Sequence, residues 1–255
     1  MDTAFRDMDF VFVYIDDIAV ASASKEQHKL HLKQVFERLR RYHLTINPGK
    51  CSFGQTSIKF LGHNVDSNGI APLPDKVKTI IDFPLPKVAK ELRRFLAMIN
   101  FYRRFLPKAI IHQAPLVQLI PGNKKNDSSP ISWTEDTIKH FEECKQSLAT
   151  ATLLVHPSPD ASLSLSTDAS DTAVGAVLHQ IINEERQPLG FFSIKLTDAQ
   201  RKYSTYDREL LAIYLSIKHF RYMLEGRIFD VRTDHKPLVF AFTQKPEKAS
   251  PRQLR

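Results

Sequence analysis

Phe10-Val-Phe-Val-Tyr-Ile-Asp-Asp-Ile-Ala-Val20 places two adjacent aspartates in the middle of an apolar run. Aromatic and β-branched residues on both sides favour two short strands, and Asp tolerates turn geometry, so the stretch predicts a β-hairpin with Asp16 and Asp17 at its tip. An Asp pair in a turn is most often only a polar surface. Here the strands would hold both carboxylates rigidly, as ligands of a divalent cation require, and Mg²⁺ is the expected occupant.

A second set of carboxylates follows in the C-terminal half. Asp168 ends an alternating strand, Glu209 lies at the border of the apolar face of a long helix, and Asp234 ends a later strand. A single acid at such a position is usually a solvated charge, and Asp171 and Asp207 are close competitors in sequence. The set as a whole indicates a second metal site. The expected order is strand, strand, strand, helix and strand, at about residues 163–168, 173–180, 188–193, 203–224 and 229–234.

The region between the two sets has the pattern of helices. A helix is expected at about residues 25–42, where Ser24 and Gln27 form a capping box, followed by a strand at 58–65 and a tight turn at Asn68-Gly69. From about 71 to 150 prolines separate helices, and Thr134 caps the last of them. One helical stretch is basic, with Arg93, Arg94, Arg103 and Arg104 among seven Lys or Arg residues and Glu91 as its single acid between 87 and 108.

Composition narrows the classes of partner. The chain has 255 residues and 42% hydrophobic content, enough for real cores, and its net charge of +8 favours a polyanionic partner. Its two cysteines, Cys51 and Cys144, support neither a disulfide framework nor a zinc module and fit a reducing intracellular setting. His28 and His31 share a helix face, a spacing more typical of a surface than of a metal site. No stretch is apolar enough to span a membrane, and the first residues lack the basic-then-apolar order expected of a signal peptide.

Several motifs in one order resemble a known family. Tyr14-Ile-Asp-Asp17 resembles the metal-binding hairpin of reverse transcriptases. Downstream motifs look like the palm-to-thumb segment of Ty3/gypsy-type long-terminal-repeat retrotransposon polymerases: Leu44-Thr-Ile-Asn-Pro-Gly-Lys-Cys-Ser-Phe-Gly54, Phe60-Leu-Gly-His63, Gly69-Ile-Ala-Pro72, Leu92-Arg-Arg-Phe-Leu96 and Asn100-Phe-Tyr-Arg-Arg-Phe105. The later strands and helix resemble a ribonuclease H fold, in which the helix brings its Glu against both Asp residues. This resemblance favours Asp168 and Glu209 over their competitors.

The resemblance implies an α+β fold with an α/β ribonuclease H-like domain. It implies the C-terminal part of a polymerase palm at 1–70, a helical thumb and connection at 71–150, and a ribonuclease H-like domain, incomplete at its C-terminus, at 151–255. Two Mg²⁺ ions, or Mn²⁺ in their place, would serve each active site. The expected catalytic and metal-binding residues are Asp16, Asp17, Asp168, Glu209 and Asp234, and the expected nucleic-acid-binding residues are Phe60, Leu61, Gly62, His63, Arg93, Arg94, Arg103 and Arg104.

The implied activity is RNA-directed DNA synthesis coupled to hydrolysis of RNA in RNA–DNA hybrids. Its partners would be an RNA template, a DNA primer, the hybrid and deoxynucleoside triphosphates, in the cytoplasm or a retroelement particle, with no membrane partner. In this reading the chain is an internal fragment, and an upstream palm Asp and a fourth ribonuclease H acid lie outside it. One alternative is a catalytically inactive relic or domesticated fragment that only binds nucleic acid. Another is an unrelated two-metal nuclease, which leaves the first hairpin unexplained.

Overall fold

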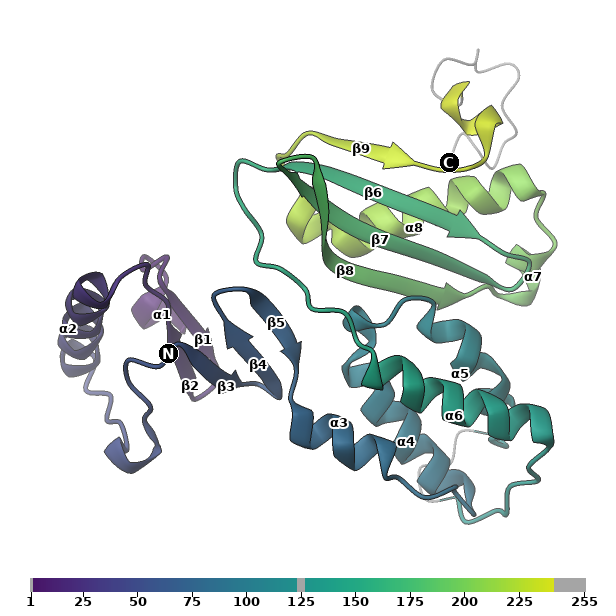
Figure 1. Cartoon of the computed structure of the whole chain (residues 1–255), viewed down its shortest axis with the longest axis horizontal. Helices are drawn as coiled ribbons and strands as arrows, with labels where there is room; N and C mark the ends of the chain where they lie inside the picture. Colours follow the sequence, from purple (N-terminus) through teal and green to yellow (C-terminus); the bar gives the residue numbers. More distant parts are fainter. Residues whose placement is uncertain (1, 123–126, 241–255) are drawn as a thin grey trace. The chain divides into compact units, whose positions relative to one another are not determined.

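The computed structural model describes residues 2–122 and 127–240. The chain divides into two compact units between Ser67 and Asn68, and each unit mixes helices with strands (Figure 1). The expected α+β class is therefore confirmed. No helix in these described ranges is both long and apolar enough to cross a membrane.

The first unit contains one long helix and two β-hairpins. Its core joins Ala4, Phe5 and Met8, around the first helix, to Val35 and Leu39 of the long helix. The elements of this unit are α1 (Asp2–Phe5), β1 (Val11–Tyr14), β2 (Asp17–Val20), α2 (Lys25–Arg41), the 3₁₀ helix η1 (Pro48–Lys50), β3 (Ser57–Phe60) and β4 (His63–Asp66).

The start of α2 follows the expected capping pattern. The Ser24 Oγ accepts a hydrogen bond from the Gln27 backbone N–H at 3.1 Å. The Gln27 Oε1 in turn accepts from the backbone N–H of Ala23, one residue earlier than a standard box, at 2.8 Å. The expected helix at 25–42 is confirmed to within one residue of its observed end, because its signals are local.

The single strand expected at 58–65 is wrong. The chain reverses at Leu61 and Gly62, which both have positive φ, 47° and 79°, and β3 pairs with β4 in antiparallel register. Two consecutive residues of positive φ make the tight turn that matches the twist of paired strands. The apolar character of Leu61 concealed this turn, so the motif Phe60-Leu-Gly-His63 forms a hairpin tip.

The second unit has a helical part and a sheet part. The helical part contains β5 (Gly69–Pro72), α3 (Pro74–Ile81), α4 (Ala89–Phe101), η2 (Arg103–Phe105), α5 (Ala109–Gln118) and α6 (Glu135–Ala149). The sheet part contains β6 (Ser162–Ala169), β7 (Ala173–Ile182), β8 (Glu185–Lys195), α7 (Asp198–Arg201), α8 (Thr205–Leu224), β9 (Phe229–Arg232) and η3 (Lys236–Phe240).

Aromatic side chains form the centre of the helical part. Phe95 of α4 packs against Phe141 of α6 with ring centroids 4.4 Å apart, and Trp133 contacts Phe141 edge-on. The Trp133 Nε1–H donates to the Pro86 carbonyl at 2.7 Å, so this indole is a core anchor with its polar group satisfied. Thr134 caps α6, as the sequence predicts, and it does so in a capping box with Thr137.

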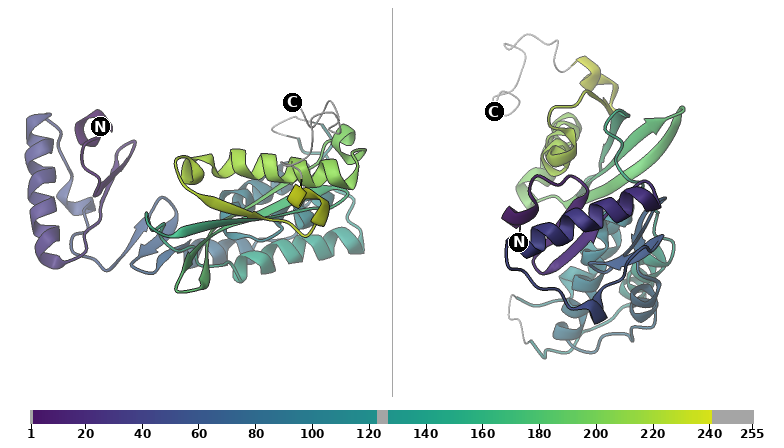
Figure 2. Two further views of the ribbon diagram at one scale, coloured as in Figure 1. Left: turned by 90° about the horizontal axis from the view of Figure 1, so that it is seen from above. Right: turned by 90° about the vertical axis from the view of Figure 1, so that its left-hand side faces the viewer.

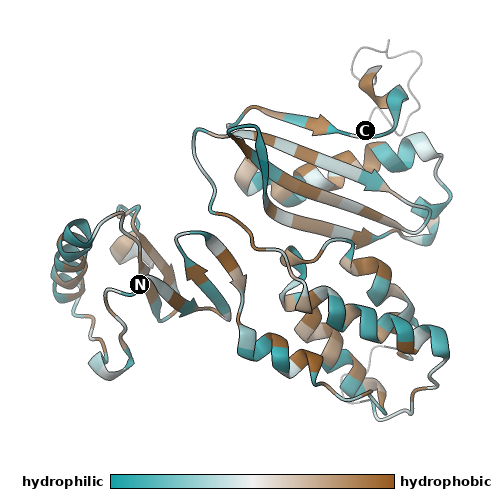
Figure 3. Ribbon diagram, in the orientation of Figure 1, coloured by the Kyte–Doolittle hydropathy of each residue, from teal (hydrophilic) through white to brown (hydrophobic). Residues whose placement is uncertain are grey.

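The sheet part has the strand order β8-β7-β6-β9, in which β9 runs parallel to β6 and the other pairs are antiparallel. The helix α8 covers one face of this sheet (Figure 2), and Leu165, Leu178 and Phe220 are buried between them. Bands of hydrophobic and polar residues alternate along the strands (Figure 3), as expected for a sheet with distinct faces.

One detail of the sheet differs from expectation. The last strand ends at Arg232, which leaves Asp234 in the segment that follows rather than on the strand. Gly69 occupies a position that excludes a side chain. Its φ is 151°, and an added Cβ would lie 2.1 Å from the Leu154 carbonyl oxygen.

Candidate active site

Three carboxylates meet at one end of the sheet of the second unit. Asp168 lies near the end of β6, Asp234 lies two residues beyond the parallel neighbour β9, and Glu209 lies in the second turn of α8. Each offers a carboxylate oxygen, and these oxygens lie within 4.8 Å of one another. Parallel neighbouring strands bring their ends to one edge, and α8 crosses the sheet to add the third acid.

Glu209 is the buried member of the cluster. Its side chain is 4% exposed, whereas Asp168 and Asp234 are exposed. The Ala169 backbone N–H donates to Glu209 Oε1 at 3.2 Å, while Glu209 Oε2 is buried and accepts no hydrogen bond from the described residues. Burial and the charges of Asp168 and Asp234 raise the pKa of Glu209, against the lowering effects of the Ala169 amide and His235.

This donor set fits a divalent cation. Oxygen ligands at about 2.0–2.1 Å from an Mg²⁺ ion lie at most roughly 4.2 Å from one another, and the three carboxylate oxygens lie within 4.8 Å, so small side-chain movements would bring them to one ion. A cation would also compensate the repulsion among three acids and satisfy the buried Glu209 Oε2. The geometry therefore supplies a carboxylate site that an Mg²⁺ ion can complete.

The structure separates the two competing acids from this site. Asp171 is exposed and forms an ion pair with Arg208, at 2.7 Å between Oδ1 and the guanidinium. Asp207 lies in the first turn of α8, where its backbone N–H donates to Ser204. The sequence pattern by itself left these alternatives open, and the contacts show that Asp168 and Glu209 are the members of the cluster.

The first pair of aspartates occupies the expected hairpin. Tyr14 pairs with Asp17 at the end of the β1–β2 ladder, and the chain turns at Ile15 and Asp16, where Ile15 has a φ of 53°. Both aspartates are exposed. Within the part of the chain that the structure describes, no third potential ligand joins them at metal-binding distance.

The candidate nucleic-acid-binding arginines differ in exposure. Arg94 of α4 and Arg104 of η2 are exposed, whereas Arg93 and Arg103 are partly buried. The Arg93 guanidinium donates to the Gly122 carbonyl at 2.6 Å, and burial lowers the pKa of Arg103. Phe60, Leu61, Gly62 and His63 form the tip of the β3–β4 hairpin described above. The exposed pair is therefore the best placed to meet a phosphate backbone.

Sequence reasoning missed one residue beside the carboxylates. His235 lies next to Asp234, its ring packs edge-on against Tyr206 of α8 at 5.9 Å, and its charge acts on Glu209. The only signal for it was its position in Arg232-Thr-Asp-His-Lys-Pro237. Because the expected strand was extended to Asp234, the local turn that directs His235 toward α8 was not foreseen.

Comparisons with known proteins identify both units. Residues 1–65 match the family model for reverse transcriptase (RNA-dependent DNA polymerase), and residues 133–231 match that for an RNase H-like domain found in reverse transcriptase. The chain therefore has reverse transcriptase and RNase H-like domains, and Asp168 and Glu209 lie within the part that matches the second of them.

More particularly, the chain is similar to retrotransposon polyproteins. It is 36% identical over 248 residues to the Transposon Tf2-3 and Tf2-4 polyproteins of Schizosaccharomyces pombe, an alignment that covers 96% of this chain and 18% of each polyprotein. Tf2 is a Ty3/gypsy-type element, so the resemblance inferred from the sequence motifs is confirmed. The chain corresponds to the reverse transcriptase and RNase H-like region of such a polyprotein.

Solved structures show the same fold. A foamy viral protease-reverse transcriptase in complex with double-stranded DNA has a TM-score of 0.82 and 20% identity, over 99% of this chain and 44% of that chain. A foamy viral protease-reverse transcriptase in complex with an RNA/DNA hybrid has a TM-score of 0.81 and 22% identity, over 99% of this chain and 34% of that chain. These likenesses establish the architecture of the chain.

Proposed function

We propose that this chain is the part of a retrotransposon polyprotein that helps to synthesise DNA on an RNA template and hydrolyses the RNA strand of the resulting hybrid. Residues 1–70 would belong to the polymerase palm, 71–150 to a thumb and connection, and 151–255 to the ribonuclease H-like domain. The observation that carries the proposal is the convergence of Asp168, Glu209 and Asp234 within 4.8 Å on the expected fold.

The three acids would act together as the metal-binding centre of the hydrolytic site. Bound Mg²⁺, or Mn²⁺, would activate the attacking water and stabilise the leaving 3′-oxygen of the RNA. Asp168 and Asp234 are exposed and therefore face the solvent from which a nucleic acid arrives. Glu209 is anchored by the Ala169 amide, which fixes one oxygen, and its other oxygen is buried and accepts no hydrogen bond from the described residues.

The polymerase role rests on the first hairpin. Asp16 and Asp17 would supply two ligands of the metal site at which a primer 3′-hydroxyl attacks a deoxynucleoside triphosphate. The hairpin tip at Phe60 to His63 would lie against the primer, and the exposed arginines of α4 and η2 against the duplex backbone. The two unpaired cysteines, Cys51 and Cys144, favour work in the reducing interior of a cell or in a retroelement particle.

The hydrolytic assignment is tested by matched substitutions of neighbouring acids. In a polyprotein segment that cleaves the RNA strand of a hybrid, Asp168→Asn or Glu209→Gln should lower the cleavage rate on the order of 100-fold or more, because a metal ligand is lost. Asp171→Asn is the control, since Asp171 lies three residues from Asp168 but pairs with Arg208. It should retain nearly full activity.

A binding measurement on the 255-residue chain separates metal binding from catalysis. Calorimetric titration with Mn²⁺ should detect binding that Asp168→Asn and Glu209→Gln weaken and Asp171→Asn does not. Full hybrid cleavage by both substituted proteins would contradict the assignment. Hybrid binding with no cleavage by any length of wild-type polyprotein would instead support the inactive, nucleic-acid-binding alternative.

A further inference from the structure

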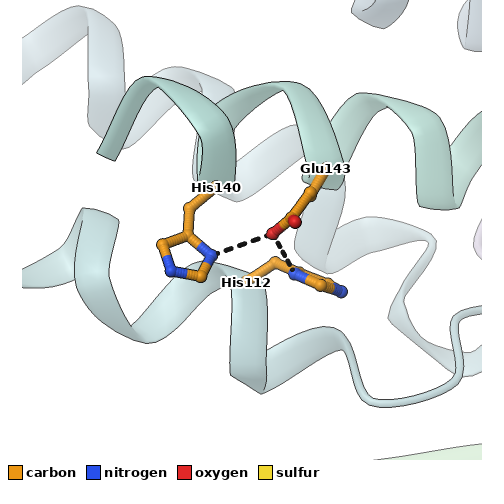
Figure 4. Close-up of side chains that lie close together, drawn as sticks. All are labelled: His112, His140 and Glu143. Atoms are coloured by element: carbon orange, nitrogen blue, oxygen red, sulfur yellow. Dashed lines mark hydrogen bonds and ion pairs between the residues drawn. The ribbon is translucent and has the colours of Figure 1, made fainter. Parts of the chain in front are cut away.

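Three side chains converge where α5 packs against α6, in the helical part of the second unit (Figure 4). The Nδ1 of His112 lies 2.8 Å from Glu143 Oε2, and the Nδ1 of His140 lies 3.0 Å from the same oxygen. His140 and Glu143 are three residues apart on α6, so they share a helix face, and His112 faces them from α5. This cluster is separate in sequence from both sets of aspartates.

The environment of the cluster favours a bound cation. All three side chains are partly buried, with exposed fractions of 26%, 21% and 33% for His112, His140 and Glu143. His140 Nδ1 is buried and makes no hydrogen bond within the described ranges, although Glu143 Oε2 is 3.0 Å away. In the tautomer that carries its proton on Nε2, the Nδ1 of His140 would offer a lone pair to a cation bound beside Glu143 Oε2.

The three side chains are of types that bind metal ions. A carboxylate binds in its ionised form, and an imidazole binds through the lone pair of a neutral ring.

We propose that His112, His140 and Glu143 bind a divalent transition-metal ion of the Zn²⁺ class. Imidazole nitrogens select such metals, whereas Mg²⁺ prefers oxygen ligands, so the chemistry of this site differs from that of the carboxylate cluster. Ligands about 2.0–2.1 Å from a tetrahedral Zn²⁺ ion lie roughly 3.3 Å from one another. The nitrogens would therefore move away from Glu143 Oε2 by about half an ångström or less.

A further acid lies near one of the ligands. Asp136 Oδ2 lies 3.8 Å from Nε2 of His140, the ring nitrogen opposite the one that faces Glu143. This distance is longer than a hydrogen bond, and an approach of about 1 Å would let the carboxylate accept the Nε2 proton and orient the ring. A bound ion would connect α5 to α6 and thereby stabilise the helical part of the chain, because binding to the folded state adds to its stability.

Cobalt spectroscopy on the 255-residue chain tests this proposal. With excess Mg²⁺ present to occupy the carboxylate sites, Co²⁺ should produce the intense visible bands of a tetrahedral complex at one equivalent, and Zn²⁺ should abolish them by displacement. Zn²⁺ should also raise the thermal unfolding midpoint. Glu143→Gln, His112→Ala and His140→Ala should each weaken Co²⁺ binding on the order of 100-fold or more, as expected for loss of a direct ligand.

The matched control is His28→Gln. His28 and His31 are a second histidine pair, with both Nδ1 atoms within 3.0 Å of Ser22 Oγ, and the cobalt spectrum should survive removal of His28. Circular dichroism would establish that each variant is folded. Absence of the tetrahedral bands in the wild-type chain, or their persistence in both His112→Ala and His140→Ala, would overturn the proposal and leave the cluster as a hydrogen-bonded ion pair. Hybrid cleavage is not part of this readout, so the two proposals can fail independently.

Discussion

His179 illustrates a residue that folding holds in its neutral form. It lies on β7 at the point where the pairing with β8 is irregular, and its Nδ1 is buried without a hydrogen-bond partner among the described residues. Burial lowers the pKa of His179, and the positive charge of Arg186 on β8 lowers it further. Folding therefore opposes protonation of this ring.

The stability of the chain should consequently fall in mild acid. Above about pH 6.5 His179 is neutral in both states and has no effect. Below that pH the unfolded chain binds the proton while the folded chain does not, so the free energy of unfolding decreases until the lowered folded pKa is reached. Urea midpoints measured from pH 7.5 to about pH 5 should decline less steeply for His179→Gln than for the wild type. The exposed His156→Gln is the control, and equal slopes in all three proteins would refute the prediction.

The identity of single site residues was only partly predictable from sequence. Asp168 lies near the end of β6 and Asp171 lies two residues beyond that strand, and a pattern of alternation does not show where the strand ends or which acid meets a distant helix. The resemblance to ribonuclease H supplied that choice. His112 could not have been found, because its partners lie 28 and 31 residues away on another helix.

At the scale of elements, α4 and η2 carry arginines of two kinds: some stabilise the fold and others are exposed to solvent. Arg93 satisfies the carbonyl of Gly122, and Arg103 is partly buried, so these two arginines contribute to the fold. Arg94 and Arg104 remain exposed and are available to phosphates. Binding of a duplex through this surface would release counterions and depend strongly on salt.

Replacing Arg94 and Arg104 should change the salt dependence of nucleic-acid binding and leave the fold largely unchanged. For hybrid binding by the 255-residue chain, Arg94→Ala with Arg104→Ala should reduce the slope of log affinity against log salt by about 1.8, since each phosphate contact contributes roughly 0.9. Lys76→Ala with Lys78→Ala removes the same charge from exposed positions on α3 and should change the slope much less. Fluorescence anisotropy across a salt series measures both, and indistinguishable slopes would contradict the assignment.

Elements with local signals were predicted well. The caps at Ser24 and Thr134 define the starts of α2 and α6 through contacts within a few residues. The turn at Leu61 and Gly62 was missed because a hairpin there requires positive φ at Leu61, which its side chain does not favour. Helix boundaries were accessible from sequence, whereas this turn depends on the pairing of β3 with β4.

At the scale of the whole molecule, the two candidate metal sites differ in how many carboxylates each unit supplies. The second unit collects three acids from β6, α8 and the segment after β9, a juxtaposition that the order of strands and helix predicted through family resemblance. The first unit presents Asp16 and Asp17 on a two-stranded hairpin, with no third ligand beside them in its described part. The sequence pattern predicted both the hairpin and the sheet. It did not predict the distances between the acids, because these depend on pairing between strands that are distant in sequence.

This difference predicts that the 255-residue chain extends no primer. Two carboxylates alone leave the metal ions of a polymerase site without the full set of ligands, so nucleotide addition should be below detection. A longer polyprotein segment that does extend a primer on an RNA template should lose activity on the order of 100-fold or more with Asp17→Asn, because a metal ligand is removed. Asp9→Asn is the matched control, since Asp9 precedes β1 and lies outside the hairpin tip. Template-dependent extension by the 255-residue chain that Asp17→Asn abolishes would show that the hairpin finds its remaining ligands within this chain.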